Sequence, residues 1–74
     1  MTAQTSSSVS LTINGESRCF AAPLSVAALL DEMGLTGKRL AVERNGEIVP
    51  KGLHALTQLA DGDVLEIVVA VGGG

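Results

Sequence analysis

The chain has 74 residues, 46% of them hydrophobic, and a formal net charge of −3 at pH 7. This length predicts one small domain, and a single Phe with no Trp or Tyr predicts an aliphatic core. Five scattered Lys and Arg residues cannot build the basic patch of a nucleic-acid-binding protein, whereas the acidic balance favours basic protein surfaces as partners. The single cysteine excludes an internal disulfide framework and a cysteine-based zinc cluster.

Residues 1–8 (MTAQTSSS) lack the basic start and the apolar stretch of a secretory signal, so we expect a disordered leader. No apolar run has the length of about 20 residues that a membrane-spanning helix needs. We therefore expect a cytoplasmic protein without a membrane partner. Its folded domain is expected at residues 9–71, followed by a flexible glycine tail at residues 72–74.

The first folded segment predicts a β-hairpin. Val9, Leu11 and Ile13 alternate with polar residues, which is the pattern of a strand with one buried face. The Asn14-Gly15 dipeptide follows, and both residues tolerate the positive φ of a tight hairpin turn. A second strand is therefore expected over residues 17–21.

The period then changes to that of a helix. Ser25 is the expected N-cap, and Gly34 is expected to end the helix. Between them, four apolar residues recur at the spacing i, i+3, i+4 and i+7 and form one stripe: Val26, Leu29, Leu30 and Met33.

A second hairpin is expected after the helix. Leu40 and Val42 would face inward from its first strand, and Asn45-Gly46 would form its turn. A brief strand at residues 48–49 would end at Pro50, which has no backbone N–H to donate to a sheet.

The last third of the chain predicts a helical turn and a final strand. The spacing of three between Leu53, Leu56 and Leu59 predicts a single turn of helix over the core. Asp61-Gly62 would then turn the chain into a strand at residues 64–71. By alternation, its inward residues would be Leu65, Ile67, Val69 and Val71.

Both faces of this last strand are largely apolar, which is typical of a central strand. The expected fold is therefore α+β, a mixed sheet of four to five strands with one main helix packed on one face. One short helix leaves the other face uncovered, where Val64, Val68 and Ala70 would form an apolar strip. We expect this strip to dock a protein partner, the alternative being the ordinary surface apolarity of a small sheet.

Residues suited to catalysis are few. His54 is the one histidine and Cys19 the one thiol, and nothing in the sequence brings them together. We expect a buried or half-buried thiol and a surface imidazole, both without a catalytic role. Residues 61–63 (DGD) are expected to form a plain turn, because the other ligand positions of an EF-hand are missing. The sequence thus predicts no bound metal and no bound cofactor.

The glycines Gly72, Gly73 and Gly74 are expected to carry the function. Three extended glycines reach roughly 10 Å and, having no Cβ, can thread a channel too narrow for other residues. A terminal carboxylate is an anion at neutral pH and a poor electrophile, so it would react only after activation, for instance as an acyl-adenylate. A frayed terminus is the alternative. The tail therefore predicts a carrier whose chemistry is performed by partners.

Over residues 9–74, the chain resembles the ubiquitin-like sulfur carriers, which have a β-grasp fold, and most of all the ThiS branch of thiamine biosynthesis. The segments that carry this resemblance are AVERNGEIVPK (41–51), LADGDVLEIV (59–68) and the final GGG. The terminal glycine pair is shared by such carriers, and NGEIVPK (45–51) points to the thiamine branch.

The resemblance implies that an E1-like adenylyltransferase activates Gly74 with ATP and magnesium. A cysteine desulfurase system would supply the sulfur that turns it into a thiocarboxylate, and thiazole synthase would take this sulfur to build the thiazole ring. Gly73 would be the obligatory neighbour of the loaded residue, and Gly72 would lengthen the tail in the partner's channel. The chain would then be a carrier and co-substrate rather than an enzyme.

Two related functions remain as alternatives. The small subunit of molybdopterin synthase has the same fold and tail but another sulfur acceptor, and its tail is typically preceded by prolines where this sequence has VVAV (68–71). A ubiquitin-like protein modifier would instead form isopeptide bonds with lysines. A third class, an interaction module with an inert tail, requires that the glycines are dispensable.

Overall fold

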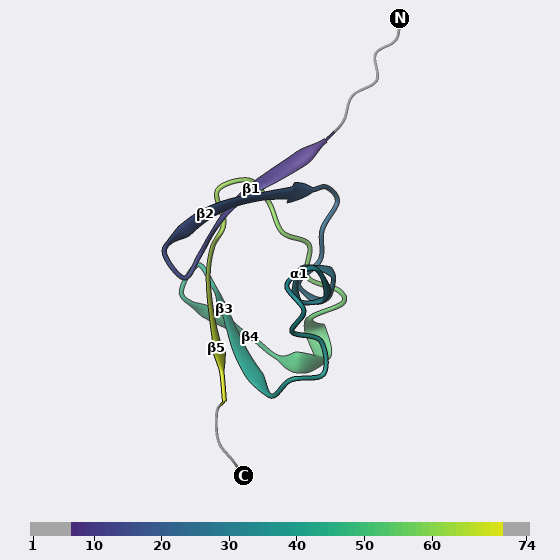
Figure 1. Cartoon of the computed structure of the whole chain (residues 1–74), viewed down its shortest axis with the longest axis vertical. Coiled ribbons are helices and arrows are strands. Elements are labelled where there is room, and N and C mark those ends of the chain that lie inside the picture. Colours follow the sequence, from purple (N-terminus) through teal and green to yellow (C-terminus); the bar gives the residue numbers. More distant parts are fainter. Residues whose placement is uncertain (1–6, 71–74) are drawn as a thin grey trace, which may run out of the picture.

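The computed structural model describes residues 7–70, which form one sheet with one helix beside it (Figure 1). In the sheet, the strands have the order β2-β1-β5-β3-β4. β1 and β5 run parallel, and the other neighbouring pairs run antiparallel. This mixed five-stranded sheet with one main helix confirms the predicted α+β architecture. Along the chain, the elements are β1 (Ser8–Ile13), β2 (Glu16–Ala21), α1 (Val26–Glu32), β3 (Leu40–Arg44), β4 (Glu47–Val49), the 3-10 helix η1 (Lys51–Leu53) and β5 (Val64–Val69).

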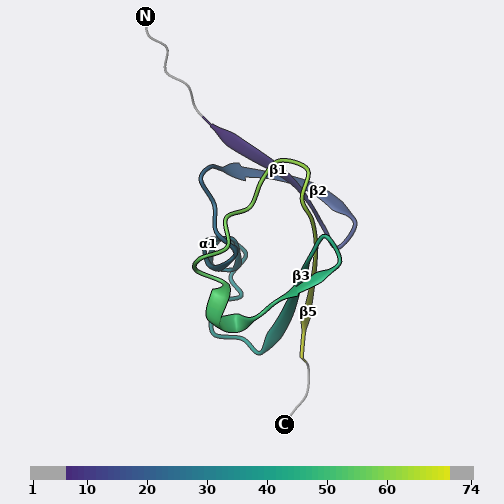
Figure 2. The ribbon, with the colours of Figure 1, turned by 180° about the vertical axis from the view of Figure 1, so that it is seen from behind.

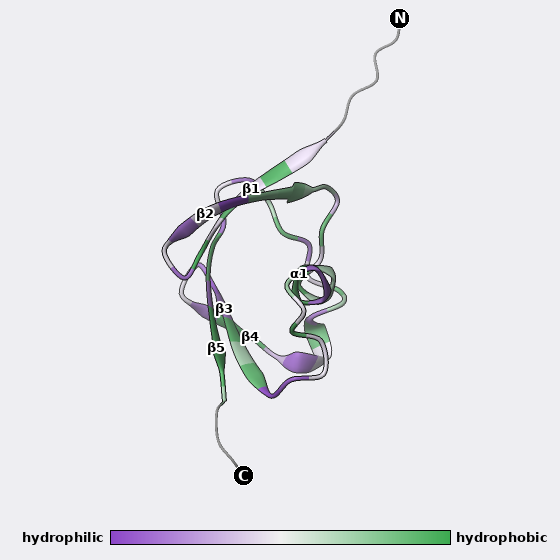
Figure 3. Cartoon of the chain, viewed as in Figure 1, coloured by the Kyte–Doolittle hydropathy of each residue, from purple (hydrophilic) through white to green (hydrophobic). Residues whose placement is uncertain are grey.

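α1 covers one face of the curved sheet, and the segment around η1 lies on the same side (Figures 1 and 2). The core fills the space between these layers, and hydrophobic residues follow β5 along its length (Figure 3). No helix in residues 7–70 is long and apolar enough to cross a membrane. The largest fully buried side chains come from both layers: Leu11, Val26, Leu29, Val42 and Leu65.

The first hairpin forms where the sequence predicts it. Val9, Leu11 and Ile13 are all buried on the face toward the helix. Asn14 and Gly15 make the turn with φ angles of 51° and 85°, a conformation in which Gly and Asn are favoured because most side chains are strained there. β1 and β2 then pair along their full six-residue length.

Both ends of α1 are capped by the predicted residues. The Ser25 side chain accepts a hydrogen bond from the Ala28 N–H at 3.0 Å. Gly34, with φ of 73°, and Leu35 donate backbone hydrogen bonds to Asp31 and Leu30, which is the pattern of a Schellman motif. An isolated helix of seven residues would not be stable in water, so α1 depends on the burial of its apolar stripe.

The leucines after β4 do not form the predicted apolar turn of helix. The 3-10 helix ends at Leu53, and the side chains of Leu53 and Leu56 are 46% and 75% exposed. Leu59 is buried instead, and its N–H donates to the Leu24 carbonyl at 2.8 Å. The prediction was wrong because Leu59 belongs to an extended segment that passes beside the start of α1, not to a helix.

β5 is the central strand, as predicted, between parallel β1 and antiparallel β3. Leu65 and Ile67 are buried and Val69 is half-buried, so the inner face of the strand is the one expected. The strand ends at Val69 rather than at residue 71, and Val71 lies outside the described residues. The predicted leader likewise lies almost wholly outside them, at residues 1–6.

Candidate functional site at the end of the central strand

Gly72, Gly73 and Gly74 lie outside the described residues, so the structure defines the site by the end of β5, from which the tail continues. Ala70, the last described residue, donates its N–H to the Arg39 carbonyl at 2.9 Å. This hydrogen bond places Ala70, which we call the root of the tail, beside the start of β3. The end of β5 and the start of β1 lie at opposite ends of the molecule (Figure 1).

The outer face of the sheet carries the predicted apolar strip. Val64 and Val68 are 50% and 65% exposed, and Ala70 is exposed as well. The strand register extends the strip beyond β5, because Ala41 lies directly opposite Val68 and Ile48 lies on the same face of β4. All of these side chains point away from α1. The three predicted residues therefore share the outer face of the sheet with Ala41 and Ile48.

Two glutamates interrupt this apolar face. Glu43 on β3 and Glu66 on β5 are direct cross-strand partners. Like charges placed directly opposite one another destabilise a sheet, and neither carboxylate forms an ion pair within residues 7–70. The outer face therefore combines apolar side chains with negative charge, a combination complementary to a partner surface with apolar and basic groups.

The Asn14 side chain, in the turn of the first hairpin, forms hydrogen bonds with the middle of β5. Its Oδ1 accepts a hydrogen bond from the Ile67 N–H at 2.8 Å, and its Nδ2 donates to the Ile67 carbonyl at 3.1 Å. β1 and β5 pair over two residue positions before β1 ends at Ile13, so the Asn14 side chain continues the contact with β5 beyond the end of β1. The sequence predicts Asn14 as a turn residue alone, because 53 residues separate it from its partner.

The start of β5 is held by Asp63, the buried polar residue of the described chain, with 7% of its surface exposed. Its carboxylate accepts hydrogen bonds from Arg44 Nε at 2.8 Å, Asn45 Nδ2 at 3.0 Å and the Ala60 N–H at 2.9 Å. The DGD segment is thus a turn, as predicted, but the buried carboxylate also joins that turn to the β3–β4 hairpin.

Opposing effects act on the pKa of Asp63. Burial raises this pKa, while the hydrogen bonds from Ala60, Asn45 and Arg44 and the charge of Arg44 lower it. The lowering prevails, so the pKa of Asp63 lies below its usual value of 3.8 and the group is ionised at neutral pH. Asp63 is therefore a structural residue, since its carboxylate accepts three hydrogen bonds from neighbouring residues.

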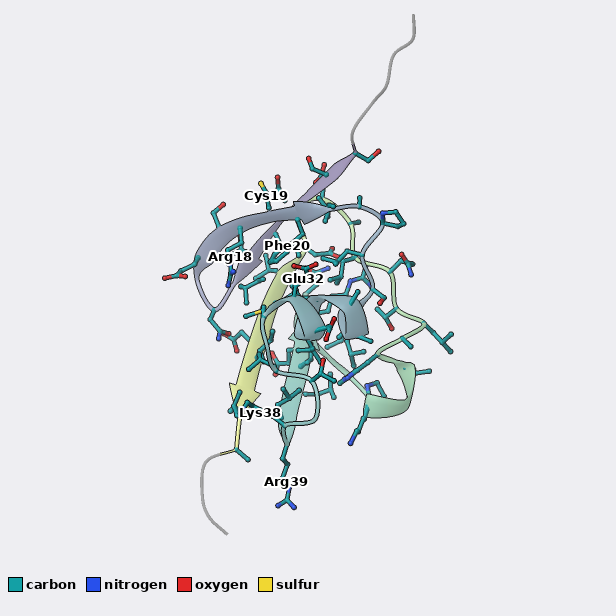
Figure 4. All side chains as sticks on the ribbon, turned by 45° about the vertical axis from the view of Figure 1, so that its right-hand side comes forward. Arg18, Cys19, Phe20, Glu32, Lys38 and Arg39 are labelled. Atoms are coloured by element: carbon teal, nitrogen blue, oxygen red, sulfur yellow. The ribbon has the colours of Figure 1, made fainter. Side chains whose placement is uncertain are left out.

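Cys19 and His54 are not brought together, as expected, but their exposures differ from the prediction. Cys19 is exposed on the outer face of β2, where its Sγ lies 3.3 Å from Ser10 Oγ, and it points away from the helix (Figure 4). His54 is half-buried beside α1, and its Nε2 donates to the Val49 carbonyl at 3.0 Å. The sheet separates the two side chains. Within residues 7–70, no group of three His, Cys, Asp or Glu residues is placed to hold a metal ion.

Residues 11–74 match the sequence profile of the ThiS family. A thiazole synthase of Paramagnetospirillum magneticum is 55% identical over 64 residues, which cover 86% of this chain and 20% of that protein. The sulfur carrier protein ThiS of Bacillus subtilis is 44% identical over 50 residues, which cover 68% of this chain and 76% of that protein.

The crystal structure of the thiamine biosynthesis protein ThiS from Geobacter metallireducens matches the fold with a TM-score of 0.76 at 32% identity. The match covers 89% of this chain and 100% of that one, and it confirms the ubiquitin-like β-grasp fold. The chain spans 20% of the length of the thiazole synthase that it matches. Its family is nevertheless shown by the profile match over residues 11–74: the chain belongs to the ThiS family.

Proposed function

We propose that this protein is a sulfur carrier for thiazole formation in thiamine biosynthesis, and that the carboxylate of Gly74 is the group that carries the sulfur. The observation that supports this most is the ThiS-family match, which extends through residue 74 and so includes all three tail glycines. The Bacillus subtilis relative, named a sulfur carrier protein, supports the same function.

In the proposed reaction, the Gly74 carboxylate attacks ATP on an E1-like adenylyltransferase, giving an acyl-adenylate and pyrophosphate. A protein persulfide, the product of a cysteine desulfurase system, then displaces AMP and gives an acyl disulfide. A thiol reductant attacks the cysteine sulfur of this acyl disulfide, forms a new disulfide with it and releases the acyl-bound sulfur. One carbon–oxygen bond breaks and one carbon–sulfur bond forms, which leaves a thiocarboxylate on Gly74. ATP and magnesium belong to the activating partner, so the chain is a carrier and co-substrate rather than an enzyme.

Gly72 and Gly73 would let the tail pass through the partner's channel, because backbone without a Cβ can approach surrounding atoms closely. Thiazole synthase is the proposed acceptor of the sulfur. Two relatives that bear this name match the chain, at 55% and 34% identity. These reactions are expected in the cytoplasm.

The outer face of the sheet is the proposed docking surface for the activating enzyme. Val64, Val68 and Ala70 lie on β5 and the residue that follows it, and the tail continues from the same strand. A partner that binds this strip would therefore hold the root of the tail at a fixed position. Glu43 and Glu66 would meet basic groups of the partner, which would relieve their mutual repulsion.

The test is intact-protein mass spectrometry after incubation with the adenylyltransferase, ATP, magnesium and a desulfurase system from the same organism. We expect one oxygen to be exchanged for one sulfur, at Gly74. A variant that lacks Gly74 should fold normally but remain unloaded. Gln58→Ala is the control and should load normally, because Gln58 is exposed and lies outside both the strands of the sheet and the pocket beside α1.

Two results would contradict the proposal. Loading of the variant that lacks Gly74 would show that the sulfur is carried elsewhere. An unchanged mass together with linkage to lysines of other proteins would identify a protein modifier instead.

A further inference from the structure

A pocket of about 330 Å³ lies on the helix side of the molecule, away from the outer face of the sheet. Its walls come from α1, from the loop that joins α1 to β3, and from the segment around η1. The apolar part of its lining consists of Ala27, Leu30, Leu35, Leu40 and Ala55.

The charged residues of this pocket are all basic. Lys38, Arg39 and Lys51 line it, which are three of the five Lys and Arg residues of an otherwise acidic chain. Asp31 is the acidic residue that lies nearby, where it accepts a hydrogen bond from Thr36 of the lining at 3.4 Å. The pocket therefore has the opposite charge to the outer face with Glu43 and Glu66.

The three cations are exposed, whereas the leucines beneath them are buried or half-buried. A site built for a small anion would place buried polar donors around it, and here the charges surround an apolar floor instead. This arrangement fits a protein segment that inserts one apolar side chain and presents carboxylates to the cations around it.

We propose that this pocket, lined by Lys38, Arg39 and Lys51, docks an acidic segment of a protein partner. This inference rests on the proposed function, which names the two partners to be tested: the adenylyltransferase and thiazole synthase. Charge complementarity is its basis, because an acidic segment would be repelled from the outer face and attracted to the pocket.

The pocket lies next to Ala70, the residue from which the tail continues. Arg39 lines the pocket and also accepts the backbone hydrogen bond from Ala70. Its side chain extends outward at the end of the molecule where β5 ends (Figure 4). A partner seated in the pocket is therefore beside the root of the tail. With the outer face, the chain presents two surfaces of opposite charge that two partners can recognise separately.

The experiment measures the affinity of the full chain for each partner by calorimetry, at low and high salt. Lys51→Glu is the test variant. Arg18→Glu is the matched control, because Arg18 lies on β2 outside the pocket and the change in net charge is the same. We expect Lys51→Glu to weaken binding of at least one partner about ten-fold at low salt, with a smaller loss at high salt. Arg18→Glu should change either affinity less than about two-fold.

Equal affinities of the Lys51→Glu and Arg18→Glu variants for both partners would overturn the inference. It would also be overturned if inorganic phosphate or AMP displaced the amide resonances of residues 35–40 and 51–55 while neither partner did, because the pocket would then be a small-anion site. Sulfur loading of the wild-type chain is measured in parallel. Normal loading with equal affinities rejects the docking pocket alone, whereas absent loading rejects the proposed function.

Discussion

The two ends of the central strand β5 are held in different ways. At its start, three hydrogen bonds, two from side chains and one from the Ala60 backbone N–H, converge on the buried carboxylate of Asp63. At its end, the contact that extends the sheet is one backbone hydrogen bond, from Ala70 to Arg39. The residues near this end, Lys38, Arg39 and Ala70, are all exposed.

This difference divides β5 into a part that carries stability and an end that the proposed function assigns to partner binding. The hydrogen bonds to Asp63 at the start of β5 and those between Asn14 and Ile67 at its middle hold the strand in its place in the sheet. In the proposed function, the exposed end presents the tail to partners, while the stability of the fold is carried by the rest of the strand. Substitutions at the two ends should therefore have different consequences.

The largest expected effect is at the start of the strand. Asp63→Ala removes the acceptor for Arg44, Asn45 and the Ala60 N–H, and should lower the free energy of unfolding by about 1–3 kcal/mol. Urea titration of the purified chain would measure this change. Lys38→Ala is the control at the other end and should change stability by less than about 0.5 kcal/mol. Equal losses for the two variants would mean that the two ends contribute alike.

The second prediction concerns how the stability contributed by Asp63 depends on pH. The pKa of Asp63 is lowered in the folded protein below its ordinary value of 3.8, so the carboxylate contributes its full stability above that value and loses it as the pH falls through the folded pKa. We expect the stability difference between wild type and Asp63→Asn to be constant near neutral pH and to shrink below about pH 4. Urea midpoints measured from pH 7 downward would test this. A difference that persists at the lowest pH would show that the charge of Asp63 is not what stabilises the turn.

The smallest expected effect is at the middle of the strand, on the outer face. Glu66→Gln removes the repulsion from Glu43 and should stabilise the fold by about 0.2–1 kcal/mol at low salt. Glu47→Gln is the control, because Glu47 lies opposite Arg44 and has no like-charged partner in the register. Thermal melts of both variants would compare them. Destabilisation by Glu66→Gln would show that the glutamate pair is not a strained feature of the free protein.

Most of the secondary structure could be predicted because its causes are local. The alternation of Val9, Leu11 and Ile13 and the stripe on α1 follow from the periods of a strand and a helix. Asn14-Gly15 forms its turn because neighbouring residues decide the backbone conformation there. The central position of β5 also followed from its composition, since both of its faces are largely apolar.

The site could be predicted in part. The outward residues Val64, Val68 and Ala70 follow from alternation along a single strand. Their neighbours Ala41 and Ile48 could not be found in this way, because strand order and register decide which residues lie beside them. The exposures of Cys19 and Leu56 were predicted wrongly for the same reason: burial depends on what the rest of the chain places over a residue.

The sequence by itself thus determined the strands, the helix and their turns, because periodicity, capping and turn chemistry act between residues close in the chain. The family followed separately, from the resemblance of residues 41–51, 59–68 and 72–74 to the sulfur carriers. The tertiary structure alone decided that Asp63 meets Arg44, that Asn14 clamps Ile67, and that the basic residues of loop 36–39 and η1 line one pocket. The first two contacts follow from the pairing of β5 with β3 and with β1, which brings together residues far apart in the chain. The pocket follows from the packing of the loop after α1 and of η1 against that helix.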